Sequence, residues 1–160
     1  MSAVPRFPPD PVASRPADAV AFVTDGIALP TELDPVRTGA WLVDVAAARG
    51  RVVAALTYVL LPDDALHAMN VEYLGHDTLT DIITFDLGDG DGAPIAGECY
   101  VSLERVRDNA ADLGEPPARE LHRVLAHGLL HLCGLGDGSP AEAAAMRAAE
   151  REALGLLAAR

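Results

Sequence analysis

The sequence predicts a single α+β domain in which a small mixed β-sheet of about four strands is covered on one face by helices. Two observations predict this class. Short apolar and β-branched runs come before residue 102, whereas the chain beyond it has the periodicity of helices. In addition, 160 residues of which 50% are hydrophobic suit one domain with its own core, which we place at residues 19–160.

The chain begins with an arm, residues 1–18, that we expect to be disordered. This arm contains five prolines and almost no apolar periodicity. A short apolar strand is expected next, over residues 19–24, followed by a turn at Asp25-Gly26. Residues 35–48 then have the pattern of an amphipathic helix.

The remaining elements follow from the same rules. Apolar and β-branched runs predict three strands, at residues 51–61, 80–87 and 95–102. Pro62-Asp63-Asp64 opens a helix that runs to about residue 73. The Gly/Asp loop at residues 88–92 lacks the ligand ladder of an EF-hand and is interpreted as a solvated turn. Three helices complete the chain, over about residues 103–113, 118–133 and 140–159.

The composition is acidic and free of lysine. The formal net charge is −12, and all 12 basic residues are arginine. Such a chain repels polyanions, so RNA binding would need a local arginine-lined face or a metal ion. A high-salt host is an equally good explanation of the acidity, because salt also screens that repulsion.

Other classes of protein are disfavoured. Cys99 and Cys133 form no Cys-x-x-Cys pair, so we expect two reduced thiols packed as small hydrophobic side chains. The sequence has neither a run of roughly 18 apolar residues nor a signal-peptide pattern, so we expect no membrane partner and a cytoplasmic location.

The candidate metal-binding residues lie on a predicted helix in the C-terminal half of the chain. Four leucines at helical spacing give this helix a buried face: Leu121, Leu125, Leu129 and Leu132. His127 and His131 are four residues apart, so their imidazoles lie on neighbouring turns of one side and can share a metal ion.

The chain after this helix is expected to bring a third ligand back to the histidines. Gly134 can end the helix in a left-handed conformation, and Ser139 begins a capping box for the next helix, so Asp137 lies in a short, anchored turn. Two imidazoles and one carboxylate suit Zn²⁺, although another divalent metal could take this site. Three ligands leave the fourth position open for a hydrolytic water.

The spacing of this motif is also that of metallopeptidases, whose helix carries His-Glu-x-x-His. Here Gly128 replaces the glutamate that acts as general base, and we expect the glycine to leave open space beside the metal. Peptide hydrolysis is therefore the alternative. His67 and His122 have no partner at ligand spacing and are interpreted as surface or packing residues.

The string HGLLHLCGLGD, residues 127–137, resembles the His-Gly-x-Leu-His-Leu-x-Gly signature of the YbeY family of bacterial metal-dependent endoribonucleases. A second block supports the resemblance. Met69-Asn70 and then YLGHDTLTDIITF, residues 73–85, resemble the family's Asn-x-x-Tyr segment, its Thr-Asp pair and the apolar strand that follows. The resemblance extends from about residue 52 to the C-terminus.

The resemblance implies a mixed α+β fold with one zinc site and cleavage of single-stranded RNA. It further implies a role in 3′-end maturation of the 16S rRNA precursor and in ribosome quality control, with the ribosome or its small subunit as partner. A non-catalytic, ribosome-associated metal-binding module is a second alternative.

Two departures from the family pattern matter. Asp137 stands where the commoner pattern has a third histidine, and a carboxylate should raise the pKa of the metal's water, so we expect retained binding with altered pH dependence. Leu74 stands where many members carry an arginine that contacts the substrate phosphate. His76, Arg119 or Arg123 could supply that charge instead.

The general base stays open at this point. Asp81, Asp86 and Glu98, on neighbouring predicted strands, are candidates, and structural hydrogen bonding would explain Asp81 equally well. With three phenylalanines, three tyrosines and one tryptophan, the chain offers few stacking platforms for bases, so specificity is expected to come from a ribosomal context.

Overall fold

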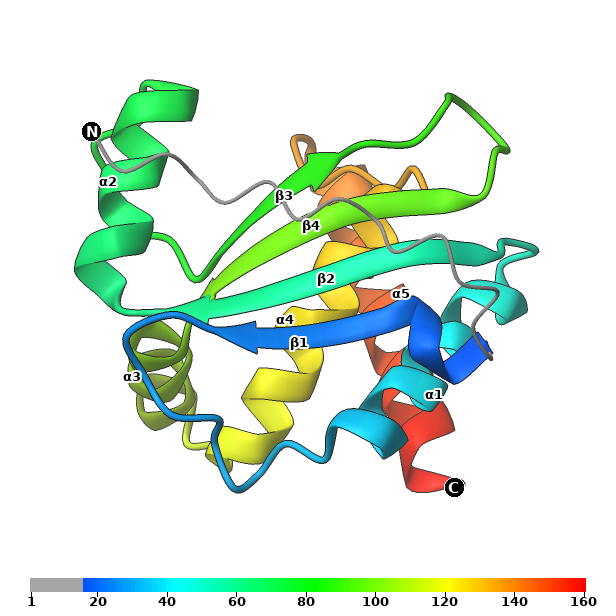
Figure 1. The fold of residues 1–160 in the computed structure, drawn as a ribbon, viewed down its shortest axis with the longest axis horizontal. Helices are drawn as coiled ribbons and strands as arrows, with labels where there is room; N and C mark the ends of the chain where they lie inside the picture. Colours follow the sequence, from blue (N-terminus) through cyan, green and yellow to red (C-terminus); the bar gives the residue numbers. More distant parts are fainter. Residues whose placement is uncertain (1–15) are drawn as a thin grey trace.

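A computed structural model describes residues 16–160, in which four strands form one mixed sheet. The sheet has the order β1-β2-β4-β3, with strands β1 (Val20–Thr24), β2 (Val53–Leu61), β3 (Ile82–Asp86) and β4 (Ile95–Ser102). The β1–β2 and β2–β4 pairs are parallel, whereas β3 runs antiparallel to β4 at the edge. The predicted mixed sheet of four strands is confirmed (Figure 1).

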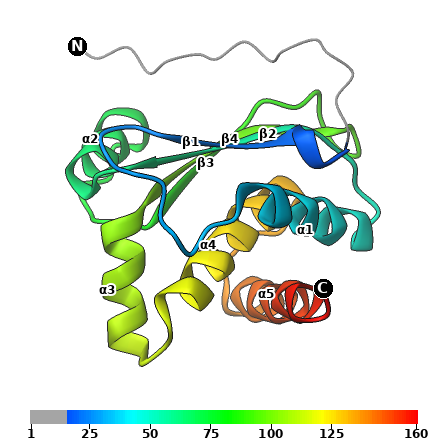
Figure 2. The same ribbon diagram turned by 60° about the horizontal axis from the view of Figure 1, so that its bottom comes forward.

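Five α-helices and one 3₁₀ helix accompany the sheet. They are η1 (Pro16–Ala19), α1 (Pro35–Ala48), α2 (Asp63–Leu74), α3 (Leu103–Leu113), α4 (Pro117–Leu132) and α5 (Pro140–Ala158). Figure 2 shows α1 and α4 directly beneath one face of the sheet and α5 in a further layer below them. Helix α2 packs on the opposite face, where Leu66 and Met69 meet Val59 and Tyr100.

The element boundaries agree with the predicted ones to within two residues. Residues 1–15 of the expected disordered arm lie outside the described residues, and residues 16–18 belong to η1. Within the described range, no helix combines the length and apolar character that crossing a bilayer requires.

The core lies between the sheet and the layer formed by α1 and α4. The four leucines of the predicted stripe on α4 are all buried, as expected. Two buried polar groups tie the layers together: the Trp41 indole donates to the Ala153 carbonyl at 2.7 Å, and the Tyr58 hydroxyl donates to the Leu125 carbonyl at 2.7 Å. Buried donors require such partners, so these bonds fix how α1, α4 and α5 are oriented.

Two glycines allow α4 to lie very close to the sheet. A Cβ on Gly128 would lie 2.7 Å from Ile82 Cδ1 and 2.9 Å from Cys99 Sγ. A Cβ on Gly97, within β4, would lie 2.8 Å from the Phe85 carbonyl oxygen and from Leu132 Cδ1. The expectation that Gly128 leaves open space beside the metal is therefore wrong. Position 128 is turned by about 100° from position 127 around the helix and faces the sheet.

Candidate metal centre

Three side chains converge where α4 ends. His127 and His131 project from the last two turns of the helix, and their Nε2 atoms lie 3.0 Å apart. Asp137 comes from the turn that follows, and its Oδ2 atom lies 3.5 Å from each of the two Nε2 atoms. The structure thus brings together the three residues that the sequence predicted as ligands.

The turn that carries Asp137 is fixed at both ends. Gly134 follows the helix with φ +103°, a left-handed conformation that suits glycine and redirects the chain. The Ser139 side chain then accepts a hydrogen bond from the Glu142 backbone N–H at 3.1 Å and begins α5. Both predicted anchors of the turn are present, so Asp137 is presented back toward α4.

The spacing of the three donor atoms fits one small divalent cation. Ligands at about 2.0–2.1 Å in tetrahedral zinc coordination lie about 3.4 Å from one another. The observed separations of 3.0, 3.5 and 3.5 Å bracket that value. Two imidazole nitrogens with one carboxylate oxygen are also a donor set that zinc accepts.

A buried carboxylate fixes which nitrogen of His127 is free. Nδ1 of His127 lies 2.9 Å from Oε2 of Glu150, a residue on α5 that is only 4% exposed. Burial alone would raise the pKa of Glu150, but the hydrogen bond with His127 and the charge of Arg123 hold that pKa below its usual range. Because an ionised carboxylate only accepts, Nδ1 carries the hydrogen and the Nε2 lone pair faces the ligand cluster.

Arg123 completes a network behind the histidine. Its Nε donates to Glu120 at 2.9 Å and its Nη1 donates to Glu150 at 3.2 Å, and the bond with Glu120 raises the pKa of the guanidinium. Its Nη2 also lies 3.8 Å from Oδ2 of Asp81. The two glutamates are almost completely buried, so each depends on Arg123 for compensation.

The sequence reasoning missed Glu150, although one signal was available. Glu150 belongs to the buried stripe of α5, together with Met146, Ala149 and Ala153. A glutamate among such apolar positions is rarely buried without a partner. The position of Glu150 in this stripe therefore indicated a buried polar partner, but not which residue that partner is.

The ligand cluster opens into a hollow of about 430 Å³, called here the metal hollow. Asp81 and Asp86 line it, whereas Glu98, the third candidate base, instead accepts a hydrogen bond from the Tyr100 hydroxyl at 2.8 Å. Burial raises the pKa of Asp81. Leu74, which replaces the family's arginine, also lines this hollow, and no arginine of the described residues does.

None of the three predicted substrate contacts lines the metal hollow. His76 follows α2 and is exposed, outside the lining of the metal hollow. Arg119 is exposed and pairs with Glu115 at 3.5 Å, and Arg119 and Arg123 both line a second hollow between α4 and α5. The sequence therefore placed both arginines near the metal helix, but the structure places them on the side facing α5.

The remaining histidines and the cysteines have the roles expected of them. His67 lies at the surface, 2.8 Å from Asp77, and His122 packs edge-on against Trp41. Burial lowers the pKa of His122. Both cysteines are free thiols, with Cys99 in the core and Cys133 half-buried.

An α+β domain with two histidines and one carboxylate converging beside an open hollow is typical of one class of protein, the metal-dependent hydrolases. Within that class the assignment is specific. The family model described as "Endoribonuclease YbeY" matches residues 40–158, and the chain belongs to this family.

Individual relatives agree with this assignment. A protein named "Endoribonuclease YbeY" from Phocaeicola vulgatus is 43% identical over 138 residues, which cover 86% of this chain and 98% of that protein. Another of the same name, from Flavobacterium johnsoniae, is 47% identical over 116 residues, covering 72% and 82%. The solution structure of TM1509 from Thermotoga maritima matches with a TM-score of 0.62 at 24% identity, covering 86% of this chain and 88% of that one, and supports the fold.

Proposed function

We propose that this chain is a zinc-dependent endoribonuclease that cleaves single-stranded RNA in the cytoplasm. Its proposed place is 3′-end maturation of the 16S rRNA precursor and ribosome quality control, with the small subunit as partner. Membership of the YbeY family supports RNA as the substrate. The observation that carries the proposal is the convergence of His127, His131 and Asp137 at the wall of the metal hollow.

The residues of the chain have separable roles in this proposal. His127, His131 and Asp137 would hold the zinc ion, which when bound supplies a Lewis acid and lowers the pKa of its water. Glu150 keeps His127 in the tautomer that can bind metal. Asp81 is the best-placed proton acceptor, because it lines the metal hollow and its pKa is raised by burial toward the range useful to a base.

Peptide hydrolysis is a poorer explanation of the same ligands. Peptidases of this spacing need a glutamate at position 128. A Cβ there would lie 2.7 Å from Ile82 Cδ1 and 2.9 Å from Cys99 Sγ, so a side chain at this position would point at the sheet and would have to displace residues there. Position 128 therefore lacks the peptidase glutamate, and its contact with the sheet also disfavours a glutamate there.

The test compares His131→Ala with His67→Ala, a control that removes a surface histidine paired with Asp77. Metal content is measured by mass spectrometry, and cleavage is measured on matched single- and double-stranded RNAs. We expect His131→Ala to lose its zinc and to cleave single-stranded RNA about 100-fold or more slowly. His67→Ala should keep both.

The contrary outcomes separate the alternatives. Loss of metal from His131→Ala with unchanged RNA cleavage would exclude the metal from the reaction. Chelator-sensitive hydrolysis of casein without RNA cleavage would favour a peptidase. Wild-type protein that binds ribosomes but leaves RNA intact would favour the non-catalytic module.

A further inference from the structure

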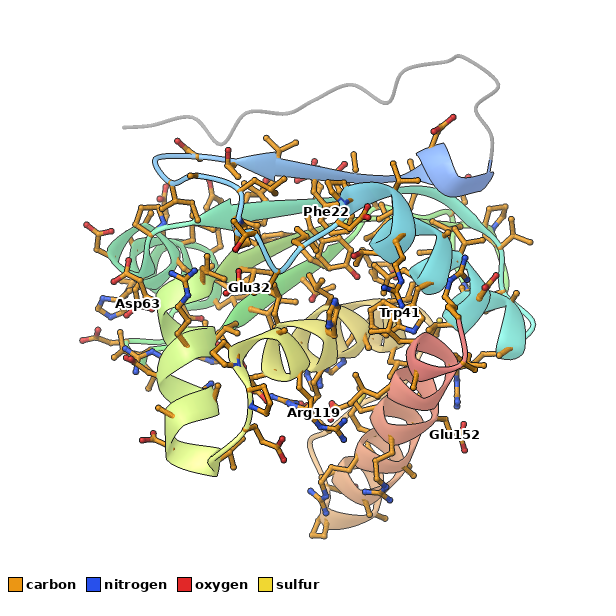
Figure 3. All side chains as sticks on the ribbon, turned by 90° about the horizontal axis from the view of Figure 1, so that it is seen from below. Phe22, Glu32, Trp41, Asp63, Arg119 and Glu152 are labelled. Atoms are coloured by element: carbon orange, nitrogen blue, oxygen red, sulfur yellow. The ribbon has the colours of Figure 1, made fainter. Side chains whose placement is uncertain are left out.

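A second hollow, of about 360 Å³, lies between α4 and α5 and is called here the arginine hollow. Its lining contains two leucines and seven charged residues: Leu113, Glu115, Arg119, Glu120, Arg123, Arg147, Glu150, Arg151 and Leu154. Four guanidiniums and three carboxylates give this lining a surplus of positive charge within a chain of net charge −12. Figure 3 shows Arg119 beside the space between the two helices.

Two of the four arginines are uncompensated. Arg123 is bound by two buried glutamates and Arg119 pairs with Glu115. Arg147 and Arg151 are exposed and form no ion pair with any residue in the range 16–160. They are four residues apart on α5, so two like charges face the same way, which disfavours the helix unless an anion lies between them. Guanidinium groups at such a place match the geometry of phosphate oxygens.

The metal hollow cannot bind an RNA backbone by charge alone. It is lined by three aspartates, Asp81, Asp86 and Asp137, and by no arginine among the described residues. A strand with its scissile phosphate at the metal therefore needs cations beyond this hollow, because neighbouring phosphates are repelled by an acidic surface.

The two hollows share a wall. His127 directs Nε2 toward the ligand cluster and Nδ1 toward Glu150, which lines the arginine hollow. Arg123 lines the arginine hollow as well, and its Nη2 is 3.8 Å from Asp81 in the metal hollow. The arginine hollow is therefore adjacent to the metal hollow, and Arg147 and Arg151 belong to its lining.

We propose that the arginine hollow binds backbone phosphates of the RNA strand whose scissile bond lies at the metal, through Arg147 and Arg151 with Arg119 at the rim. This inference rests on the proposed function and names the surface that holds its substrate. Contacts to phosphate carry no sequence information, which fits a chain with few aromatic platforms for bases.

The test compares two double variants that remove the same charge. Arg147→Gln/Arg151→Gln alters the arginine hollow, and Arg37→Gln/Arg107→Gln alters arginines on α1 and α3. Binding of a labelled, cleavage-resistant phosphorothioate single strand to the zinc-loaded enzyme is followed by anisotropy across salt concentrations. KM and kcat are measured on a long single-stranded RNA and on a trinucleotide that reaches only the metal hollow.

For the arginine-hollow variant, we expect the slope of log K against log salt to fall in magnitude by about 1.4, roughly 0.7 for each lost phosphate contact. KM for the long RNA should rise about 10-fold. The kcat and the cleavage of the trinucleotide should not change. The control variant should keep the wild-type slope to within a few tenths. Single variants, Arg147→Gln and Arg151→Gln, should each show about half of the slope change.

Two results would overturn the inference, and they are distinguishable. If the wild type cleaves RNA and both double variants bind it equally well, the arginine hollow is no RNA surface and an acidic protein becomes the better occupant. If the wild type neither binds nor cleaves RNA, the proposed function fails first and the inference fails with it.

Discussion

The two hollows on either side of His127 are both lined by α4, but their carboxylates have different partners. In the metal hollow, the donor atoms of His127, His131 and Asp137 have only one another as close partners among the described residues. In the arginine hollow, every carboxylate already has a guanidinium partner. Two imidazoles and a carboxylate that converge without a guanidinium can bind a metal cation, whereas glutamates that are already paired with arginine are poor ligands for one. The difference indicates which side of α4 is suited to a metal ion.

Glu150 should give the largest effect, because within residues 16–160 it alone is bonded to both the predicted ligand His127 and the guanidinium of Arg123. Glu150→Ala leaves the half-buried Arg123 with one partner fewer and His127 without its carboxylate, which should cost about 3 kcal/mol of unfolding free energy. It also frees the His127 ring, which should weaken metal binding by about 10- to 100-fold. Urea denaturation and competition with a chelator measure the two effects.

The control for this variant lies two residues further along the same helix. Glu152 has a side chain that is 76% exposed and lies 3.8 Å from Arg49, so Glu152→Ala should cost less than about 0.5 kcal/mol. Figure 3 shows it on the opposite side of α5 from Arg119. Equal effects of the two substitutions would mean that Glu150 does not link the hollows.

The loss of stability caused by Glu150→Ala should also depend on pH. The folded-state pKa of Glu150 is lowered, so its carboxylate contributes stability above the unfolded pKa, about 4.3, and this contribution is lost as pH falls through the folded value. The difference in unfolding free energy between wild type and Glu150→Ala should therefore narrow in acid. If this difference in unfolding free energy stays constant from neutral pH to pH 3, the Glu150 carboxylate does not contribute to stability in the way proposed.

Gly128 should give the next largest effect, because it sets how closely α4 lies to the sheet that forms the floor of the metal hollow. Gly128→Ala places a methyl group against Ile82 and Cys99 and should destabilise the fold by about 1–3 kcal/mol. Gly155→Ala, on α5, meets nothing within 4 Å and should instead stabilise by up to about 1 kcal/mol. If the denaturation midpoints of Gly128→Ala and Gly155→Ala move in the same direction, α4 does not lie as close to the sheet as described.

Asp137→His should give the smallest effect and should be confined to the metal hollow. A neutral third ligand leaves more charge on the metal, so the acid limb of the pH–activity profile should move to lower pH by about one unit or less. Asp89→His, the same substitution in the exposed 88–92 turn, should leave the profile in place. A shift of the Asp137→His profile to higher pH would show that Asp137 does not act through the metal.

The sequence predicted what depends on near neighbours along the chain. The two histidines, the Gly134 stop and the Ser139 cap lie within a short segment, and each has its own local signal. The resemblance to the YbeY family added the fold and the activity class. Strand and helix signals are local as well, so the predicted element boundaries agree with the structure to within two residues.

What the sequence did not reveal depends on packing between separate elements. The contact of Glu150 with His127 requires α5 to cross α4 at one particular place, and nothing local sets that crossing. Gly128 was misinterpreted for a related reason, because its neighbours Ile82 and Cys99 come from two distant strands. The contact of Arg123 with substrate stays a prediction, and its pairing with Glu120 and Glu150 is a further contact between separate elements that the sequence did not reveal.

The glycines around Asp137 have a kinetic consequence. His127 and His131 are fixed on a packed helix, whereas the Asp137 side chain is exposed and lies between Gly136 and Gly138 in the turn that follows. If a metal ion binds here, we expect the two imidazoles to take it up first and the carboxylate to join last and leave first. We therefore expect substitutions in the turn to change the rate of metal release more than the rate of metal uptake.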